Sequence, residues 1–214
     1  MRTELVFILD RSGSMSGLEG DTIGGYNGLL AKQKEEEGEC TVTTVLFDDR
    51  YELLHDRIPL QGVRPLTRRE YYVRGCTALL DAMGRTIEKI AAVQRNTAPE
   101  VRAEKVLFVI TTDGMENASR EFRTYQIRDL VERQKKEFGW EFLFLGANID
   151  AIAAAGELGI APERAVDFHA DSEGTRISYE TVCAAVSEVR AGHALPREWK
   201  AEIEHDHQSR PCRR

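Results

Sequence analysis

The 214-residue sequence has few of the features that mark secreted or membrane-spanning proteins. Its four cysteines, Cys40, Cys76, Cys183 and Cys212, lie far apart without a C-x-x-C pair, which favours reduced thiols used as small apolar residues over a disulfide scaffold. No apolar run approaches the roughly 18 residues that a membrane span needs. The opening MRTELVFILD carries a short apolar run that leads into an acid, so we expect no signal peptide and a cytoplasmic location.

The sequence also lacks a concentration of positive charge. Its net charge is −7, and its basic residues are scattered except at the C-terminal end, so we expect neither nucleic acid nor an anionic membrane as a partner. The motifs G-x-x-x-x-G-K-[ST], G-x-G-x-x-G and G-x-S-x-G are missing too, which removes the usual nucleotide loops and the nucleophile elbow. With 42% hydrophobic and 30% charged residues, the composition is that of an ordinary globular domain.

Short apolar runs alternate with segments of helical periodicity along most of the chain. Strands are predicted at 4–9, 40–49, 50–60, 105–113, 140–148 and 165–169, with 40–49 and 50–60 forming a hairpin. Helices are predicted at 20–38, 77–96, 125–139, 150–159 and 176–192. This order predicts an α/β, doubly wound fold with a mostly parallel central sheet of about six strands, one antiparallel edge strand, and helices on both faces. We expect this domain over 1–192, followed by a polar tail over 193–214 that is mobile or loosely docked.

Three polar motifs stand at the ends of predicted strands or at the start of a helix. DRSGS follows the strand at 4–9, RGCTALLD begins the helix at 77–96, and TTDG stands at the end of the strand at 105–113. In an open parallel sheet, ligands bind outside the carboxyl ends of the strands, where the strand order reverses. The motifs therefore offer two carboxylates and three hydroxyls at one edge, from Asp10, Ser12, Ser14, Thr77 and Asp113.

A ligand set made only of oxygen suits a hard divalent cation, Mg²⁺ first, with Mn²⁺ or Ca²⁺ as alternatives. The neutral hydroxyls leave such a cation with residual positive charge, so that it can accept an acidic ligand from outside. The set therefore indicates a binding site before a catalytic one.

These three motifs, in this order, resemble the metal-ion-dependent adhesion site (MIDAS) of von Willebrand factor type A (VWA) domains, and the alternation from about residue 4 to 190 is similar to the Rossmann-like fold of that family. The resemblance implies that Ser12 and Ser14 coordinate the ion through their hydroxyls. It implies that Thr77 does so directly or through water, and that Asp10 and Asp113 act directly or through waters. It also implies a protein partner that offers a Glu or Asp to the metal. Beyond residue 150 the sequence is similar to a bacterial and phage-associated group with this domain, for which fold is implied and activity is not.

Two residues depart from the family pattern. Arg11 occupies the variable place in D-x-S-x-S, where we expect it either to attract an acidic partner or to face solvent. Cys76 stands before Thr77, where a small residue such as glycine is common, and is interpreted as a packing residue.

Other functions stay open at this point. A Mg²⁺-dependent phosphoester hydrolase of the haloacid dehalogenase type needs a second acid two residues after Asp10, and Ser12 stands there instead. A metal-polarised serine can act as a nucleophile, but no base is positioned by the sequence to accept its proton. In a metal-free scaffold the loops only hold the fold together, with Asp10 and Asp113 as helix caps.

Four further acidic or histidine features receive structural interpretations. Asp81 is read as a favourable charge at a helix N-terminus in preference to a metal ligand. The segment Glu204 to His207 offers two histidines around an acid, and we expect a solvated tail there in preference to a metal site. His55 and His169 are expected to be structural or exposed.

Overall fold

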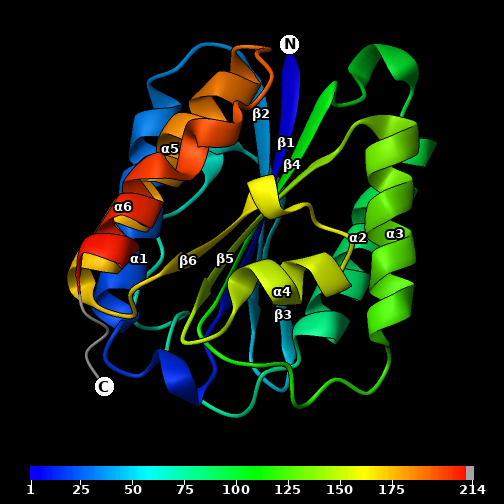
Figure 1. Ribbon diagram of the computed structural model, residues 1–214. Coiled ribbons are helices and arrows are strands. Elements are labelled where there is room, and N and C mark those ends of the chain that lie inside the picture. Colours follow the sequence, from blue (N-terminus) through cyan, green and yellow to red (C-terminus); the bar gives the residue numbers. More distant parts are fainter. Residues whose placement is uncertain (211–214) are drawn as a thin grey trace.

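Residues 1–210 are the part of the chain that the computed structural model describes, and they form one six-stranded sheet with helices on both sides (Figure 1). The strands are β1 (Arg2–Asp10), β2 (Glu39–Phe47), β3 (Tyr51–Pro59), β4 (Lys105–Thr112), β5 (Glu141–Ala147) and β6 (Ala165–Phe168). The helices are α1 (Glu19–Lys34), α2 (Leu79–Asn96), α3 (Thr124–Phe138), α4 (Ala151–Glu157), α5 (Ser172–Arg190) and α6 (Ala201–Ser209).

The strand order is β3-β2-β1-β4-β5-β6, and every pair is parallel except β2 with β3. The predicted α/β fold with one antiparallel edge strand is therefore confirmed. From β1 the chain proceeds outward to β2 and β3, and later returns to β4 on the other side of β1. The strand order thus reverses between β1 and β4, and the carboxyl ends of these two strands mark the switch point.

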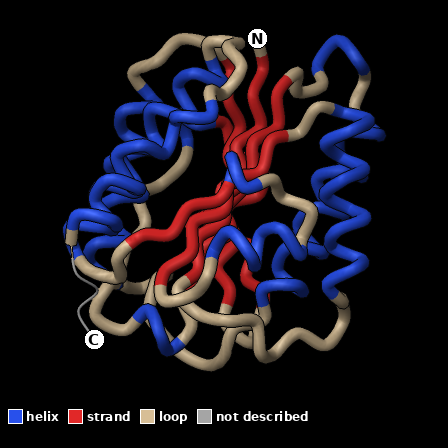
Figure 2. The backbone as a smooth tube through the Cα atoms, viewed as in Figure 1, coloured by secondary structure: helices blue, strands red, loops and turns tan. Residues whose placement is uncertain are grey.

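The central strand β1 is buried on both faces, as its uninterrupted apolar run predicts. Leu5, Phe7 and Leu9 belong to one core cluster, which α1 and α5 cover. Val6 and Ile8 point to a second cluster that includes buried side chains of α2, α3 and α4. Each fully buried side chain of this size contributes about 1.5–3 kcal/mol. Figure 2 shows the resulting three layers, with the sheet between two sets of helices.

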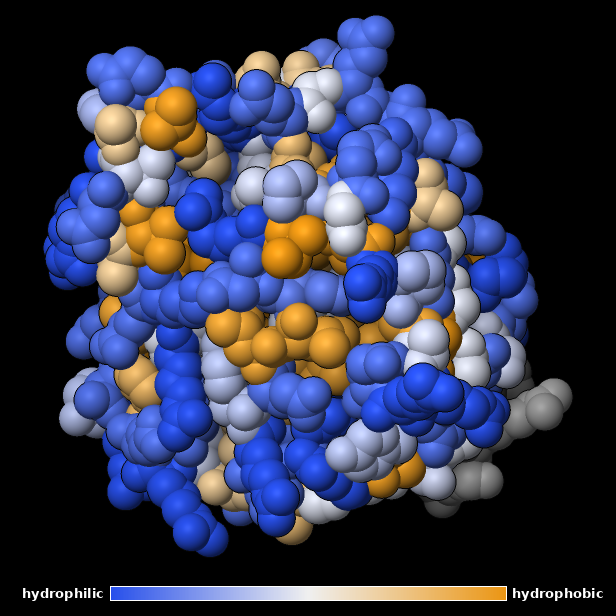
Figure 3. Space-filling view, turned by 180° about the vertical axis from the view of Figure 1, so that it is seen from behind, coloured by the Kyte–Doolittle hydropathy of each residue, from blue (hydrophilic) through white to orange (hydrophobic). Residues whose placement is uncertain are grey.

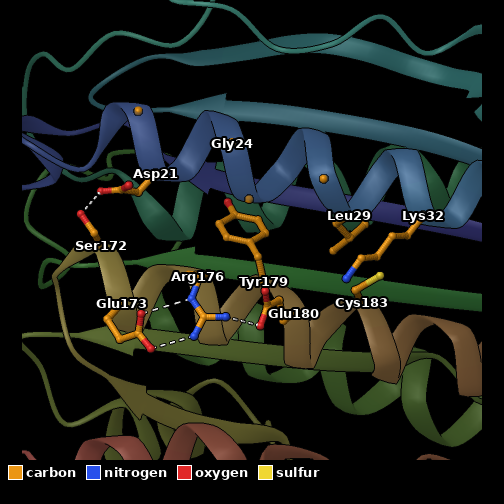
Figure 4. A pocket seen from close by; sticks show the side chains of 13 residues that line it. Asp21, Gly24, Leu29, Lys32, Ser172, Glu173, Arg176, Tyr179, Glu180 and Cys183 are labelled. Carbon is orange, nitrogen blue, oxygen red and sulfur yellow. Dashed lines mark hydrogen bonds and ion pairs between the residues drawn. The ribbon is translucent and has the colours of Figure 1, made fainter.

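The helices α1 and α5 pack closely at one point and part at another. A Cβ on Gly25 would lie 2.3 Å from Cδ2 of Tyr179, so this glycine permits the close approach of the two helices. Gly24 and Gly28 have open space instead, and they line a groove of about 550 Å³ between the helices (Figure 4). Along one wall of this groove, the Arg176 side chain forms ion pairs with both Glu173 and Glu180 (Figure 4).

The expectation of a mobile or loosely docked C-terminal tail is wrong for residues 193–210. Leu195, Trp199 and Ile203 belong to the core cluster beneath α5. The Trp199 indole N–H donates to the carbonyl of Glu163 at 2.9 Å, and the buried Lys200 ammonium donates to the carbonyls of Pro162 and Ala165 at 2.8 and 2.7 Å. Helix α6 is thus fastened to β6 and its preceding turn. The domain boundary at residue 192 stays a prediction, and residues 211–214, with Cys212, lie outside the described residues.

The surface opposite the view of Figure 1 is largely hydrophilic, with hydrophobic side chains in separate patches (Figure 3). None of the helices within residues 1–210 combines the length and the apolar character needed to cross a bilayer. Cys40 and Cys183 are buried free thiols, as expected. Cys76 is exposed, so its interpretation as a packing residue is wrong.

Candidate metal site

The three polar motifs meet at the carboxyl edge of β1 and β4, the lower edge of the sheet in Figure 1. β1 ends at Asp10, and β4 ends immediately before Asp113. The segment before α2 brings Thr77 to the same place. All five predicted site residues are therefore brought together by the topology.

Hydrogen bonds join these side chains into one cluster. The Thr77 hydroxyl donates to the Ser12 hydroxyl at 3.1 Å, and the hydroxyls of Ser12 and Ser14 lie 3.0 Å apart. The Ser14 hydroxyl donates to Oδ1 of Asp113 at 2.5 Å. On the inner side, Oδ1 of Asp10 accepts the backbone N–H of Ser12 at 2.6 Å. Five oxygen-bearing side chains from three loops thus converge on one point.

Access to this cluster is from one side. Asp10, Ser12, Thr77 and Asp113 are buried, at 0–3% exposure, whereas Ser14 is exposed. A ligand that reached a cation held here would arrive beside Ser14 and the exposed residues of the neighbouring loops. The site therefore lies at the surface, with four of its residues buried and only Ser14 exposed.

Both carboxyl groups are held in an unfavourable environment for a negative charge. Burial is the main cause that raises the pKa of Asp113 to about 6, and the charge of Asp10 adds to it. Burial also raises the pKa of Asp10, although hydrogen bonds from Thr112 and Ser12 oppose the shift. Oδ2 of Asp113 is buried and has no hydrogen-bond partner among residues 1–210. Two neighbouring buried acids with an unpartnered oxygen are stabilised by a cation placed between them.

The donor set fits a hard divalent cation. It contains carboxylate and hydroxyl oxygens and neither imidazole nor thiolate. Among residues 1–210, no three His, Cys, Asp or Glu side chains gather in a way that could hold a metal. Any metal at this edge would consequently depend on the serine and threonine hydroxyls.

The loop after Asp113 encloses Thr77 and was not foreseen from the sequence. Oδ1 of Asn117 accepts the backbone N–H of Thr77 at 2.9 Å, and the carbonyl of Thr77 accepts the N–H groups of Asn117 and Ala118 at 3.0 and 3.2 Å. The Glu116 carboxylate accepts the N–H of Leu80 in the first turn of α2 at 2.9 Å. An acid is favourable at a helix N-terminus, but Glu116 is far from α2 in the sequence. The sequence alone therefore gave no reason to pair the two.

Thr112 is a second residue that the sequence reasoning missed. Its hydroxyl donates to Oδ2 of Asp10 at 2.6 Å, and Tyr71 donates to the carbonyl of Asp10 at 2.5 Å. Thr112 belongs to the TTDG motif, and its position next to Asp113 was the sequence feature that could have identified it as part of the site. These two residues fix the aspartate at the end of β1.

Both expectations for Arg11 are wrong. Its side chain is fully buried, so it neither faces solvent nor presents a charge to a partner. It pairs with Asp48 and Glu52, whose positions in the β2–β3 hairpin no local pattern around Arg11 could reveal.

The remaining predicted features have structural roles. The Asp81 carboxylate accepts the backbone N–H groups of Arg120, Glu121 and Phe122, each at 2.9 Å, and so organises the loop before α3. His169 is buried, with its ring centroid 4.7 Å from that of His207 in α6. Asp10 and Asp113 do not cap the α-helices that follow them, because the N-cap residues of α1 and α3 are Leu18 and Arg123.

Comparisons with known proteins support the fold. No protein-family model matches the chain, and no curated protein matches it in sequence. Proximal thread matrix protein 1 from the mussel byssus, in a structure with a zinc-occupied MIDAS motif, matches with a TM-score of 0.58 at 14% identity, over 85% of this chain and 45% of that chain. A variant of the PilB minor pilin from Streptococcus sanguinis matches with a TM-score of 0.60 at 13% identity, over 99% and 64%.

The ArnB paralog VWA2 from Sulfolobus acidocaldarius matches with a TM-score of 0.52 at 16% identity, over 86% of this chain and 44% of that chain. This chain spans less than two thirds of each of these three neighbours. At such identities the likeness concerns the backbone alone. The chain has the α/β fold that VWA proteins share.

Proposed function

We propose that the protein is a divalent-metal-dependent interaction module that binds an acidic side chain of a partner protein through a MIDAS-type site. The observation that carries the proposal is the convergence of Asp10, Ser12, Ser14, Thr77 and Asp113 in one cluster with an unpartnered carboxylate oxygen. Ser12, Ser14 and Thr77 would supply hydroxyl oxygens, and the two aspartates would supply charge. A neighbour of the same fold has a zinc-occupied MIDAS motif, which supports a metal at this edge.

The metal we propose is Mg²⁺, with Mn²⁺ or Ca²⁺ as alternatives. An all-oxygen set with two carboxylates has the hard donors that these ions prefer. When bound, the ion would supply a positive centre that attracts a carboxylate. Ser12, Ser14 and Thr77 would be neutral ligands, and Asp10 and Asp113 would act directly or through waters, so the ion would keep residual positive charge for a partner's Glu or Asp.

Binding is favoured over catalysis by the chemistry around Ser12. A second acid at that position would serve a hydrolase as proton donor and acceptor, whereas Ser12 offers a hydroxyl that hydrogen-bonds the Thr77 and Ser14 hydroxyls. Ser14 donates to Asp113, but a metal that recruits Asp113 withdraws it from proton transfer. A phosphoester hydrolase stays the alternative, and it predicts turnover that depends on Asp10. The cytoplasmic location likewise stays a prediction.

Partner capture tests this function. The immobilised protein should retain a partner from an extract of its source cells in Mg²⁺ and release it in EDTA. The Ser12→Ala/Ser14→Ala variant should retain none, because two hydroxyl ligands are gone. Ser16→Ala is the matched control, since Ser16 is exposed in the same loop and its hydroxyl contacts no site residue.

The identified partner then permits the sharper step. Replacing its contacting Glu or Asp by the amide should abolish capture, because an amide carries no charge for the metal. Capture that EDTA and the Ser12→Ala/Ser14→Ala variant leave unchanged would instead support the metal-free scaffold.

A further inference from the structure

We infer that Asp48, together with Arg11 and Arg74, forms a positioning cluster that sets the spacing of two metal-binding loops, the one with Ser12 and Ser14 and the one with Thr77. This inference rests on the proposed function, because it assigns the cluster a role in metal affinity. The cluster contributes no oxygen to the five-residue site. It acts through the backbone that carries Ser12, Ser14 and Thr77.

The centre of the cluster is a buried ion pair, and Arg74 and Glu52 at its edge are partly exposed. The side chains of Arg11 and Asp48 are both fully buried, and Nε of Arg11 lies 3.1 Å from Oδ2 of Asp48. Nε of Arg74 lies 2.6 Å from the same oxygen, and an Nη of Arg11 lies 2.7 Å from the Glu52 carboxylate. Removing such charges from water is unfavourable, and apolar residues of similar volume often give equal or greater stability. The network therefore calls for an explanation other than stability.

The backbone connects this network to two of the metal-binding loops. The N–H of Arg74 donates to the carbonyl of Arg11 at 3.0 Å, and the N–H of Gly13 donates to the carbonyl of Gly75 at 3.2 Å. The first loop, with Ser12 and Ser14, and the second loop, with Thr77, are thus paired side by side. The two guanidinium groups that share Oδ2 of Asp48 come from these same two loops.

Asp48 also fixes the start of α2. Its carbonyl accepts the N–H of Ala78, next to Thr77, at 2.8 Å, while its Oδ1 accepts the N–H of Arg50 at 2.7 Å. Gly75 has φ +66°, and a Cβ there would lie 2.2 Å from Oδ1 of Asp49. The hairpin turn at 48–50 therefore packs against the second loop so closely that a shift of one moves the other.

Tyr72 covers the network on its outer side. Both guanidinium groups lie 5.3 Å from the centre of its ring, and Arg74 donates to its hydroxyl at 3.1 Å. Arg11 occupies the position between Asp10 and Ser12, so holding its side chain below the loop fixes which way the flanking oxygens face. Metal affinity depends on such placement, and residues behind the ligands commonly change it about 10- to 100-fold.

Mg²⁺ titration of variants tests the cluster. Arg74→Met removes one charge from the surface side of the network and should raise the Kd for Mg²⁺ about 10-fold, as should Asp48→Asn. Arg74→Lys keeps the charge and should restore most of the affinity. Arg133→Met is the matched control, because Arg133 pairs with Glu137 on the exposed face of α3, away from the cluster. The Kd of this variant for Mg²⁺ should be unchanged.

Thermal unfolding in EDTA separates positioning from mere stability. A purely structural role predicts a lower Tm with an unchanged Kd for the folded protein, and that result would overturn the inference. If Asp48→Asn does not fold, the comparison of Arg74→Met with Arg74→Lys decides alone. If the wild-type protein and Arg74→Met bind Mg²⁺ equally well, the positioning role of the cluster is refuted but the proposed function is not. A wild-type protein that binds no Mg²⁺ refutes both.

Discussion

Replacing Asp113 by asparagine should make the metal-free protein more stable at neutral pH and remove its stabilisation by Mg²⁺. Asp113 has a folded pKa of about 6 against an ordinary value of 3.8, mainly because burial disfavours its charge. A raised carboxyl pKa contributes no penalty below the unfolded pKa and its full penalty above the folded pKa. The difference, 6 minus 3.8 pKa units, corresponds to at most about 3 kcal/mol.

Asparagine cannot ionise, so Asp113→Asn escapes this penalty. Its amide nitrogen would take the place of one carboxylate oxygen without an assured partner, which reduces the gain to about 1–2 kcal/mol. Urea unfolding at neutral pH in EDTA measures it. Near pH 4 this gain should disappear, because the aspartate is then protonated in the folded state and carries no penalty.

The same variant should gain no stability from Mg²⁺, whereas the wild-type protein should gain it through binding to the folded state. Asp129→Asn is the matched control, since Asp129 is exposed on α3 and should change neither measurement. The account is contradicted if Asp113→Asn is less stable in EDTA and is still stabilised by Mg²⁺.

Replacing Trp199 by alanine should lower the free energy of unfolding by about 3–5 kcal/mol. Trp199 is only 9% exposed, packs into the main core cluster and donates a hydrogen bond to the carbonyl of Glu163. Its loss leaves a cavity under α6 and an unpaired carbonyl. Urea unfolding monitored by circular dichroism measures the change, because far-ultraviolet signal does not depend on the tryptophan itself.

Glu198→Ala is the control for this segment, since Glu198 is exposed beside Trp199 and surface changes are usually within about 0.5 kcal/mol. Trp199→Phe keeps most of the apolar volume and should lose less than Trp199→Ala. A Trp199→Ala variant as stable as the wild-type protein would mean that residues 193–210 are loosely docked after all.

The strands and helices were predictable because their periodicities are local. The run at 4–9 is continuous, so it predicts a strand buried on both faces, and the hairpin follows from the polar break at 48–50. The convergence of Asp10 and Asp113 followed from topology, because parallel neighbouring strands end at the same edge. Thr77 needed the family motif as well, since nothing local links it to β1.

The burial of Arg11 and the docking of α6 were not predictable, because both depend on contacts with segments distant in the sequence. Arg11 is buried because Asp48 and Glu52 meet it from another segment, and a sequence pattern treats an arginine as solvated by default. In the C-terminal segment, Leu195, Trp199 and Ile203 are spaced four apart, but charged residues and Pro196 separate them. These three residues form a short apolar stripe, which can be recognised only when the surface of β6 that it covers is known.

The most direct measurement of the central claim is a calorimetric titration of the purified protein with Mg²⁺, repeated on Ser12→Ala/Ser14→Ala. We expect saturable binding by the wild-type protein and by Ser16→Ala, and its loss in the double variant, because both hydroxyl ligands from the first loop are then missing. Equal Mg²⁺ binding by the wild-type protein and the double variant, or no binding by either, would contradict a metal site built on these loops.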